Sequence, residues 1–374
     1  MLTALVALAV LGQAPAPKVI EMTDSVGAAI VGQIHLVSDE EDPALPVLGE
    51  VIAAQSDPSQ PTTVVVLPGM MRVETKAPAH REQDVVNLLC RSVASLMIDE
   101  DGAEKALKHA RRETQGYVIQ SRWGFDPIGP GDPDQLLTGS LARATAPGNY
   151  FIVGQGDFEP GAMSKAIVGL IWPSGRQTNA SETRHPGKAL MPDGVEAVQW
   201  RGKALKPGSI EWTQAVVASC ALGSGPGGVL QEVCRRTNAW SYDQEAVLWP
   251  TRSGFVPVVS VFRKSGSETK AADVQKALTD KVDALSATDL ARAAHMAKNA
   301  LQGDPRWSPV LVAPDLAYTA SRSDKVTWRG FGEIWGSSTA LPKMFVQPVE
   351  QVTLDQLKKT CREWLNDSRR QVLD

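Results

Sequence analysis

The histidines come first, because imidazoles one helical turn apart are common ligands of a hydrolytic metal ion. The chain has five, and no two lie within five residues of each other: His35, His80, His109, His185 and His295. No helix face can therefore carry two imidazoles one turn apart. His109 and Glu113 are spaced i, i+4, which favours a surface hydrogen bond or ion pair on a helix. A zinc site built from His80, His109 and Glu113 stays open as the alternative, since a catalytic zinc normally takes three protein ligands.

Other catalytic motifs are incomplete. The glycine-rich run 223–228 is not followed by the Lys-Ser/Thr of a phosphate-binding loop. Gly139-Ser140 lacks the Gly-x-Ser-x-Gly frame of a hydrolase nucleophile. Neither run therefore indicates nucleotide binding or serine hydrolysis.

The four cysteines form no C-x-x-C motif, so a cysteine zinc site is not indicated. They are Cys90, Cys220, Cys234 and Cys361. Cys220 and Cys234 flank one glycine-rich turn and could pair in an exported protein. We favour the interpretation that all four are small buried apolar side chains.

The length and net charge of the chain limit the classes of function it can have. The chain has 374 residues, about the length of two domains. Its formal net charge is −4, and no run of Lys or Arg forms a basic stripe. This argues against nucleic acid or an anionic membrane as the partner.

The N-terminal residues have the pattern of a secretory signal peptide. An apolar run, Leu2–Leu11, is followed by small residues and by Pro15 and Pro17. No basic residue precedes the run, so a disordered or packed N-terminal strand stays open as the alternative. We expect residues 1–17 to be the signal and the protein to be exported, periplasmic or extracellular in a bacterium. No other stretch is long enough for a membrane helix, and the mature chain is expected to have no span.

Strand-like and helix-like stretches alternate in two similar runs, which predicts an α+β or α/β arrangement of helices against sheets. The polar, Gly- and Pro-punctuated segment 173–192 is the predicted linker. Predicted strands are 26–37, 62–67, 71–75, 149–154, 198–204 and 254–263. Predicted helices are 84–97, 102–118, 160–170, 229–236, 270–285, 287–301 and 354–364. Residues 124–134 are predicted to be a loop, and 214–222 an apolar run before a glycine turn.

Two stretches resemble the pitrilysin/insulinase-type zinc peptidases, in particular their processing-peptidase-like branch. Residues 149–160 (NYFIVGQGDFEP) resemble the family's strand, Gly-Asp turn and helix. Residues 221–233 (ALGSGPGGVLQEV) resemble its glycine-rich turn and the helix after it. The resemblance implies an α+β fold of two homologous lobes, each a mainly antiparallel sheet covered by helices. The lobes would span residues 18–175 and 193–374.

The family's zinc motif is missing. Members carry H-x-x-E-H on a helix of the first lobe, and the corresponding helix here is expected at 45–53, which has Glu50 and no histidine. The resemblance matches Glu113 with the acidic position of the family's long helix. The segment before the strand at 62–67 also looks shorter than the family's.

The family places an Arg and a Tyr, four residues apart, against its substrate. The resemblance assigns this substrate-binding role to Arg236 and Trp240, or to Tyr242 in a shifted register. An Arg beside an aromatic ring can hold a peptide carbonyl. That Trp240 is core and Arg236 a solvated neighbour is the equally weighted alternative.

The leading hypothesis is a catalytically inactive metallopeptidase homologue without a cofactor. It would bind an extended peptide, or act as the partner of an active peptidase or as a homodimer. An active metalloendopeptidase with the atypical zinc ligands named above is the second hypothesis. A scaffold protein of the cell envelope is the third.

Overall fold

The computed structural model describes residues 16–24, 29–39, 42–56, 59, 62–94, 96, 98–121, 133–146, 148–168, 170, 191–223, 227–241, 243–302, 322–336 and 346–373. For residues 112–121, 133–134, 322–324 and 346–347 it describes the backbone alone. Most of the predicted signal peptide and of the predicted linker lies outside the described residues. The chain divides into two compact units, Met1–His109 with Ile128–His185 and Ala110–Pro127 with Pro186–Asp374. The lobe limits at 175 and 193 stay a prediction.

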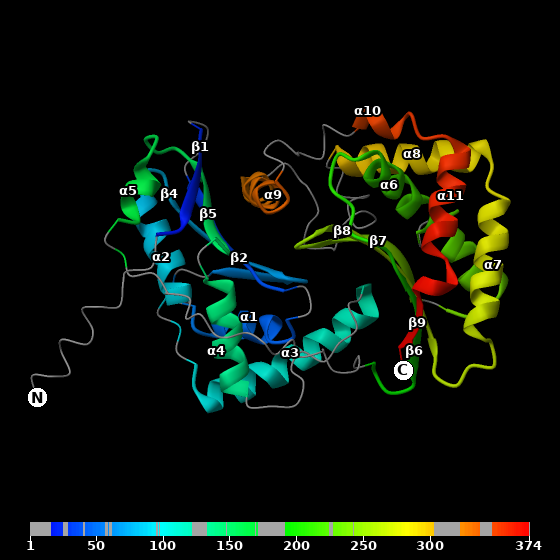
Figure 1. Ribbon diagram of the computed structural model, residues 1–374, viewed down its shortest axis with the longest axis horizontal. Helices are drawn as coiled ribbons and strands as arrows, with labels where there is room; N and C mark the ends of the chain where they lie inside the picture. Colours follow the sequence, from blue (N-terminus) through cyan, green and yellow to red (C-terminus); the bar gives the residue numbers. More distant parts are fainter. Residues whose placement is uncertain are drawn as a thin grey trace, which may run out of the picture. The chain divides into compact units, whose positions relative to one another are not determined.

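The first unit is built on a five-stranded sheet with the order β1-β5-β2-β4-β3 (Figure 1). Its strands are β1 (Lys18–Thr23), β2 (Ala29–Val37), β3 (Thr63–Leu67), β4 (Met70–Pro78) and β5 (Tyr150–Gly156). β1 runs parallel to β5, and the other described pairs are antiparallel. The valine and isoleucine runs of β2 and β3 suit a pleated, half-buried surface.

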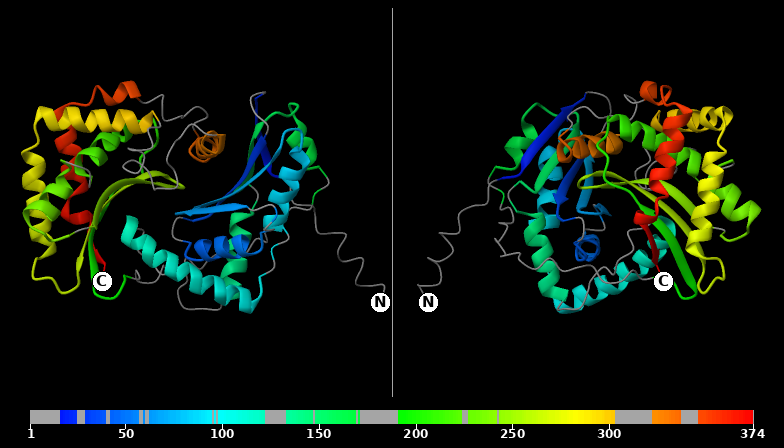
Figure 2. Two further views of the ribbon diagram at one scale, coloured as in Figure 1. Left: turned by 180° about the vertical axis from the view of Figure 1, so that it is seen from behind. Right: turned by 45° about the vertical axis from the view of Figure 1, so that its right-hand side comes forward.

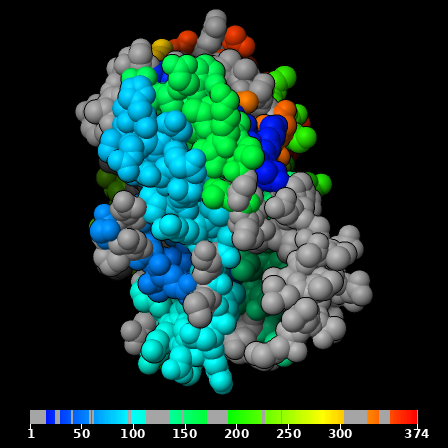
Figure 3. Space-filling model, turned by 90° about the vertical axis from the view of Figure 1, so that its left-hand side faces the viewer, coloured from blue at the N-terminus to red at the C-terminus, as the bar shows by residue number. Residues whose placement is uncertain are grey.

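Helices cover one face of this sheet. They are α1 (Leu45–Ala54), α2 (Glu82–Ala94) and α5 (Ala162–Ala166), while α3 (Glu100–Ser121) and α4 (Pro133–Ala144) follow α2 in the chain. α2 and α5 lie side by side on the face shown in Figure 3, in light blue and green. Gly32 in β2 permits the close approach of α2, because a Cβ there would overlap Val85 Cγ1.

The second unit is built on a four-stranded antiparallel sheet with the order β7-β8-β6-β9. The strands are β6 (Val195–Arg201), β7 (Asp243–Thr251), β8 (Gly254–Lys264) and β9 (Arg370–Leu373). The longer helices are α6 (Ile210–Leu222), α7 (Ala271–Asp283), α8 (Ala287–Leu301), α9 (Arg322–Ile334) and α11 (Leu354–Trp364). Shorter elements are the π-helix η2 (Gln231–Thr237), α10 (Val346–Val349) and the 3₁₀-helix η6 (Asp367–Arg369). α6, α7, α8 and α11 gather on one side of the sheet (Figure 2). No helix in the described part of the chain is long and apolar enough to cross a membrane.

Aromatic side chains fix α9 to the second unit. Trp328 of α9 and Trp335, which directly follows α9, lie 5.8 and 5.0 Å from the buried ring of Phe255, measured between ring centroids. Trp335 also donates a hydrogen bond of 2.9 Å from Nε1 to the carbonyl of Thr251. The tryptophans here are packing residues, as large buried aromatic rings usually are.

The predicted fold class is confirmed: both sheets are mainly antiparallel and carry helices on one face. The order β5-β2-β4-β3 in the first unit is repeated as β9-β6-β8-β7 in the second. This repeat supports two homologous lobes. The helices at 287–301 and 354–364 begin and end where predicted, because Ser286 and Thr353 cap them.

Several elements differ from the sequence prediction. The helix predicted at 229–236 is largely a π-helix from Gln231, and Pro133–Asp134 begin α4 rather than continuing the predicted loop. The apolar run at 214–222 belongs to a helix that starts at Ile210, after the Ser209 cap. The elements that were not predicted are β1, α4, β7, α9, α10, η6 and β9.

All four cysteines are free and buried, which confirms the favoured interpretation. Burial raises the pKa of the Cys234 thiol to about 12 and raises those of Cys220 and Cys361 further. The thiols therefore stay protonated and unreactive at neutral pH.

The contact at Gly32 predicts a stability loss. Gly32→Ala should lower the free energy of unfolding by about 1 to 3 kcal/mol, because its methyl group displaces Val85 and with it α2. Gly139→Ala is the control: on α4 the nearest atom to the new Cβ is Arg143 Nη1 at 3.5 Å. That change should be neutral or stabilising by up to about 1 kcal/mol, since alanine favours a helix. Equal urea midpoints for the two variants would contradict this packing.

His35 predicts a pH dependence of stability. Its ring is buried and stacked on Phe151 at 5.1 Å, and burial, followed by the charge of Arg72, lowers its pKa to about 3. The unfolded chain binds the proton from about pH 6.5 downward, whereas the folded chain stays neutral, so acid favours unfolding. Between pH 7 and pH 5 the wild type should lose about 2 kcal/mol more stability than His35→Phe, which keeps a ring and removes the titration. Parallel stability curves for the two proteins would refute the assignment.

Candidate functional site

α1 lies where the sequence places the metal-binding helix, and it carries Glu50. With Glu50 as the glutamate of H-x-x-E-H, the two histidines would stand at positions 47 and 51. These positions hold Val47 and Val51, which are 0% and 3% exposed. Both positions of the helix are therefore packed in the core, and apolar side chains cannot ligate a metal ion.

A buried carboxylate fixes the start of α1. The side chain of Asp42 is 1% exposed. It accepts hydrogen bonds from Ser38 Oγ at 2.6 Å, Ser140 Oγ at 2.9 Å and Arg143 Nη2 at 3.0 Å. Asp42 also accepts from the backbone N–H of Ala44 at 3.1 Å, one of the unpaired donors at a helix start. Its bonds to α4 therefore hold the helix that bears Glu50.

Glu50 is paired with a histidine from α3. His109 Nδ1 lies 2.9 Å from Glu50 Oε2, and the two side chains are 59% and 29% exposed. One imidazole and one carboxylate are too few ligands for a catalytic zinc. The side chain of Glu113 lies outside the described residues, so its predicted place beside His109 stays a prediction.

His80 is engaged elsewhere in the first unit. It lies in the turn between β4 and α2, and its Nε2 is 3.8 Å from Asp157 Oδ2. Its backbone N–H donates to the carbonyl of Asp157 at 3.1 Å. The structure thus places His80 and His109 beside different carboxylates. Within the described ranges, no group of three or more His, Cys, Asp or Glu residues could hold a metal ion.

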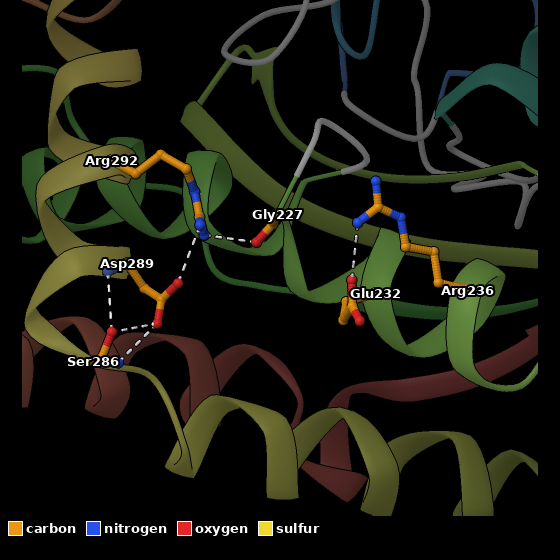
Figure 4. Close-up of polar contacts among 6 residues, drawn as sticks. All are labelled: Gly227, Glu232, Arg236, Ser286, Asp289 and Arg292. Atoms are coloured by element: carbon orange, nitrogen blue, oxygen red, sulfur yellow. Dashed lines mark hydrogen bonds and ion pairs between the residues drawn. The ribbon is translucent and has the colours of Figure 1, made fainter.

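In the second unit, η2 carries the predicted substrate-binding arginine. Arg236 Nη1 lies 3.4 Å from Glu232 Oε2, and its side chain is 57% exposed (Figure 4). Trp240 is half-buried and follows Ala239, whose φ of 50° is left-handed. The N–H of Trp240 donates to the carbonyl of Cys234 at 2.7 Å. Both residues thus belong to one ordered segment, whereas Tyr242 lies outside the described residues.

The turn before η2 is held by α8. Arg292 Nη2 donates to the carbonyl of Gly227 at 2.6 Å, and Nη1 lies 3.1 Å from Asp289 Oδ1 (Figure 4). Ser286 donates to Asp289 Oδ2 from its N–H at 2.9 Å and from Oγ at 2.7 Å. Ser286 was recognisable in the sequence as an N-cap, but nothing there connects Arg292 with a residue 65 positions earlier.

Solved structures identify the fold. A Pseudomonas fluorescens domain described as the inactive domain of peptidase M16 matches with TM-score 0.65 at 13% identity, covering 96% of this chain and 94% of that one. A chain of complex III2 from Candida albicans matches with TM-score 0.61 at 12% identity, covering 95% and 92%. The chain has the fold of M16 peptidase domains.

A third structure with the M16 fold is longer. The periplasmic protease PqqL from Escherichia coli matches with TM-score 0.60 at 11% identity, over 93% of this chain but 43% of that one. No protein-family model and no curated protein matches the sequence. The resemblance read from the residues is therefore confirmed at the level of the M16 fold.

The geometry of α1 predicts weak zinc binding. Tag-free protein that is exposed to zinc and then dialysed should retain well below one ion per chain by mass spectrometry of the metal. His109→Ala should leave that value unchanged and alter stability by less than about 1 kcal/mol, because its contact with Glu50 is largely exposed. One tightly held ion per chain, lost on His109→Ala, would show that α1 and α3 form a metal site.

Proposed function

We propose that this chain is a catalytically silent homologue with the M16 fold, which binds an extended peptide or serves as the partner of an active zinc peptidase. One observation carries the proposal. α1 has Glu50 but carries buried valines at both histidine positions of the motif, while β3 beside it is the last strand of its sheet among the described residues. The proposal accordingly assigns the chain no cofactor.

β3 is the strand on which we place the peptide. Leu67 and Met70 close the two-residue turn to β4, so Leu67 and Val65 bond to β4, whereas the N–H groups of Val64 and Val66 point away from β4, where no described strand pairs. Four of its five residues are at least partly exposed. Such an edge can accept a further strand through backbone hydrogen bonds.

The corresponding edge of the second unit is less suited to a peptide. β7 is buried from Ala246 to Thr251, and it contains Pro250, which has no N–H to donate. Proline at a sheet edge is a common protection against strand addition. The contrast favours β3.

Arg236 is the residue that we propose to bind a peptide carbonyl. Its exposed ion pair with Glu232 stabilises the fold by less than about 1 kcal/mol, so the guanidinium can exchange that partner for a ligand at low cost. Trp240 offers a half-buried aromatic surface in the same segment. Tyr242 is the alternative aromatic partner under the shifted register.

The similar structures support a partner role and export. A chain with this fold is part of complex III2 in Candida albicans, and PqqL is described as periplasmic. We propose that the chain works as a homodimer or beside an active peptidase, outside the cytoplasm. Affinity purification from the native cell should recover a second subunit that carries H-x-x-E-H. Recovery of cell-wall components alone would instead favour the envelope scaffold.

Peptide binding at a strand edge has a specific signature. Wild-type protein should bind a subset of short unstructured peptides on an array. N-methylation of alternate residues in one bound peptide should weaken its affinity by about 10-fold or more in one register, because backbone donors are lost. N-methylation in the other register should have little effect. Equal effects in both registers, or no bound peptide at all, would exclude binding by strand addition.

The arginine is tested with its neighbour as control. Arg236→Ala should weaken binding of an array peptide that the second unit binds by about 10-fold, the loss of one charge-assisted hydrogen bond. Arg235→Ala removes the same charge one residue away and should change affinity by less than about 2-fold, since general attraction is screened by salt. Equal losses of affinity in both variants would show that Arg236 contributes only through its net charge.

A further inference from the structure

On the basis of the proposed function, we infer that Arg292 is a positioning residue for peptide binding at Arg236. It touches no peptide. It holds Gly227, and through Gly227 the segment 227–241 that contains η2, Arg236 and Trp240. The inference thus names a residue on α8 that sets the geometry of a binding group on another element.

The contact between Arg292 and Gly227 depends on a glycine at the turn. Gly227 has a φ of 80°, and a Cβ on it would lie 2.6 Å from Arg292 Nη1 and 2.8 Å from Arg292 Cζ. Only glycine therefore lets the guanidinium lie against the turn. The fork-shaped guanidinium serves two partners at once, the carbonyl of Gly227 and the carboxylate of Asp289.

The anchor of Arg292 is itself fixed. Asp289 is the third residue of α8 and forms a capping box with Ser286. Burial alone would raise the pKa of Asp289, but the hydrogen bonds from Ser286 and the charge of Arg292 outweigh burial and leave that pKa below its ordinary value. The carboxylate stays ionised at neutral pH and keeps the guanidinium directed at the turn.

η2 is a π-helix, a form that is rare, occurs mostly as single turns and is often found at functional sites. At its C-terminal end the N–H of Asn238 donates to the carbonyl of Val233 at 3.2 Å, and Asn238 Nδ2 donates to the same oxygen at 2.9 Å. At its N-terminal end the N–H of Glu232 donates to the carbonyl of Gly228 at 3.0 Å. Gly228 follows directly on the residue that Arg292 holds, so this bond joins the clamp to η2 and to Arg236.

The test compares Arg292→Gln, Arg292→Lys, Arg236→Ala and the double variant Arg236→Ala/Arg292→Gln. Lys298→Gln is the matched control: Lys298 also lies on α8 and is paired at 2.5 Å, but with Glu350. Two readouts are needed, amide hydrogen exchange of the whole chain and affinity for the array peptide that wild-type protein binds most tightly.

Arg292→Gln should raise the rate of amide hydrogen exchange within residues 227–237 by about 10-fold or more, with other segments unchanged. It should also lower the affinity for the peptide. Arg292→Lys should give intermediate values, because one ammonium group replaces the fork. Arg236→Ala should lower the affinity for the peptide without altering the rate of hydrogen exchange. The double variant should lose no more affinity than Arg236→Ala, because Arg292 acts through Arg236.

The outcomes separate this inference from the proposed function. Unchanged exchange in Arg292→Gln, additive loss of affinity in the double variant, or equal effects of Lys298→Gln would overturn the positioning role while peptide binding stands. If wild-type protein binds no array peptide, the proposed function fails and the positioning role for a peptide fails with it. Exchange in Arg292→Gln then still decides whether Arg292 holds the turn.

Discussion

The packing of α1 on strands β3 and β4 is the constraint from which the account follows. Val47 and Val51 are buried, and Gly49 approaches the sheet so closely that a Cβ there would lie 2.6 Å from Val66 Cγ2. A histidine at 47 or 51 would replace a buried valine with a larger, polar ring that the core would have to accommodate. The chain thus has the M16 fold with valines, which cannot ligate a metal ion, at positions 47 and 51 of α1.

The two units share a strand order but use their edges differently. In the first unit β3 lies exposed at the end of the sheet, and in the second unit Pro250 and burial protect the matching strand β7. The second unit instead carries its candidate function on η2, which is ordered by hydrogen bonds at both ends. A silent homologue needs only such binding elements, and each can exist without a catalytic centre.

Much of the fold could be predicted from local signals. α8 and α11 were located to the residue because Ser286 and Thr353 are side-chain caps, which are local chemistry. β9 was missed because it has four residues and is defined by its pairing with β6, a contact that no local pattern encodes. The π-helix was missed because its side chains resemble those of an ordinary helix. The pairs Glu50–His109 and Gly227–Arg292 depend on tertiary structure. Sequence patterns singled out Glu50, His109 and the glycine run that contains Gly227 but not Arg292, and they predicted neither contact.

The most direct test of the central claim is anomalous diffraction at the zinc absorption edge, on crystals of the whole protein grown with zinc. We expect no ordered peak near Glu50 and His109, because one imidazole and one carboxylate beside buried valines are too few ligands to hold the ion. A peak at about 2.0 to 2.2 Å from His109 and two carboxylates would contradict it and establish a metal centre with unusual ligands.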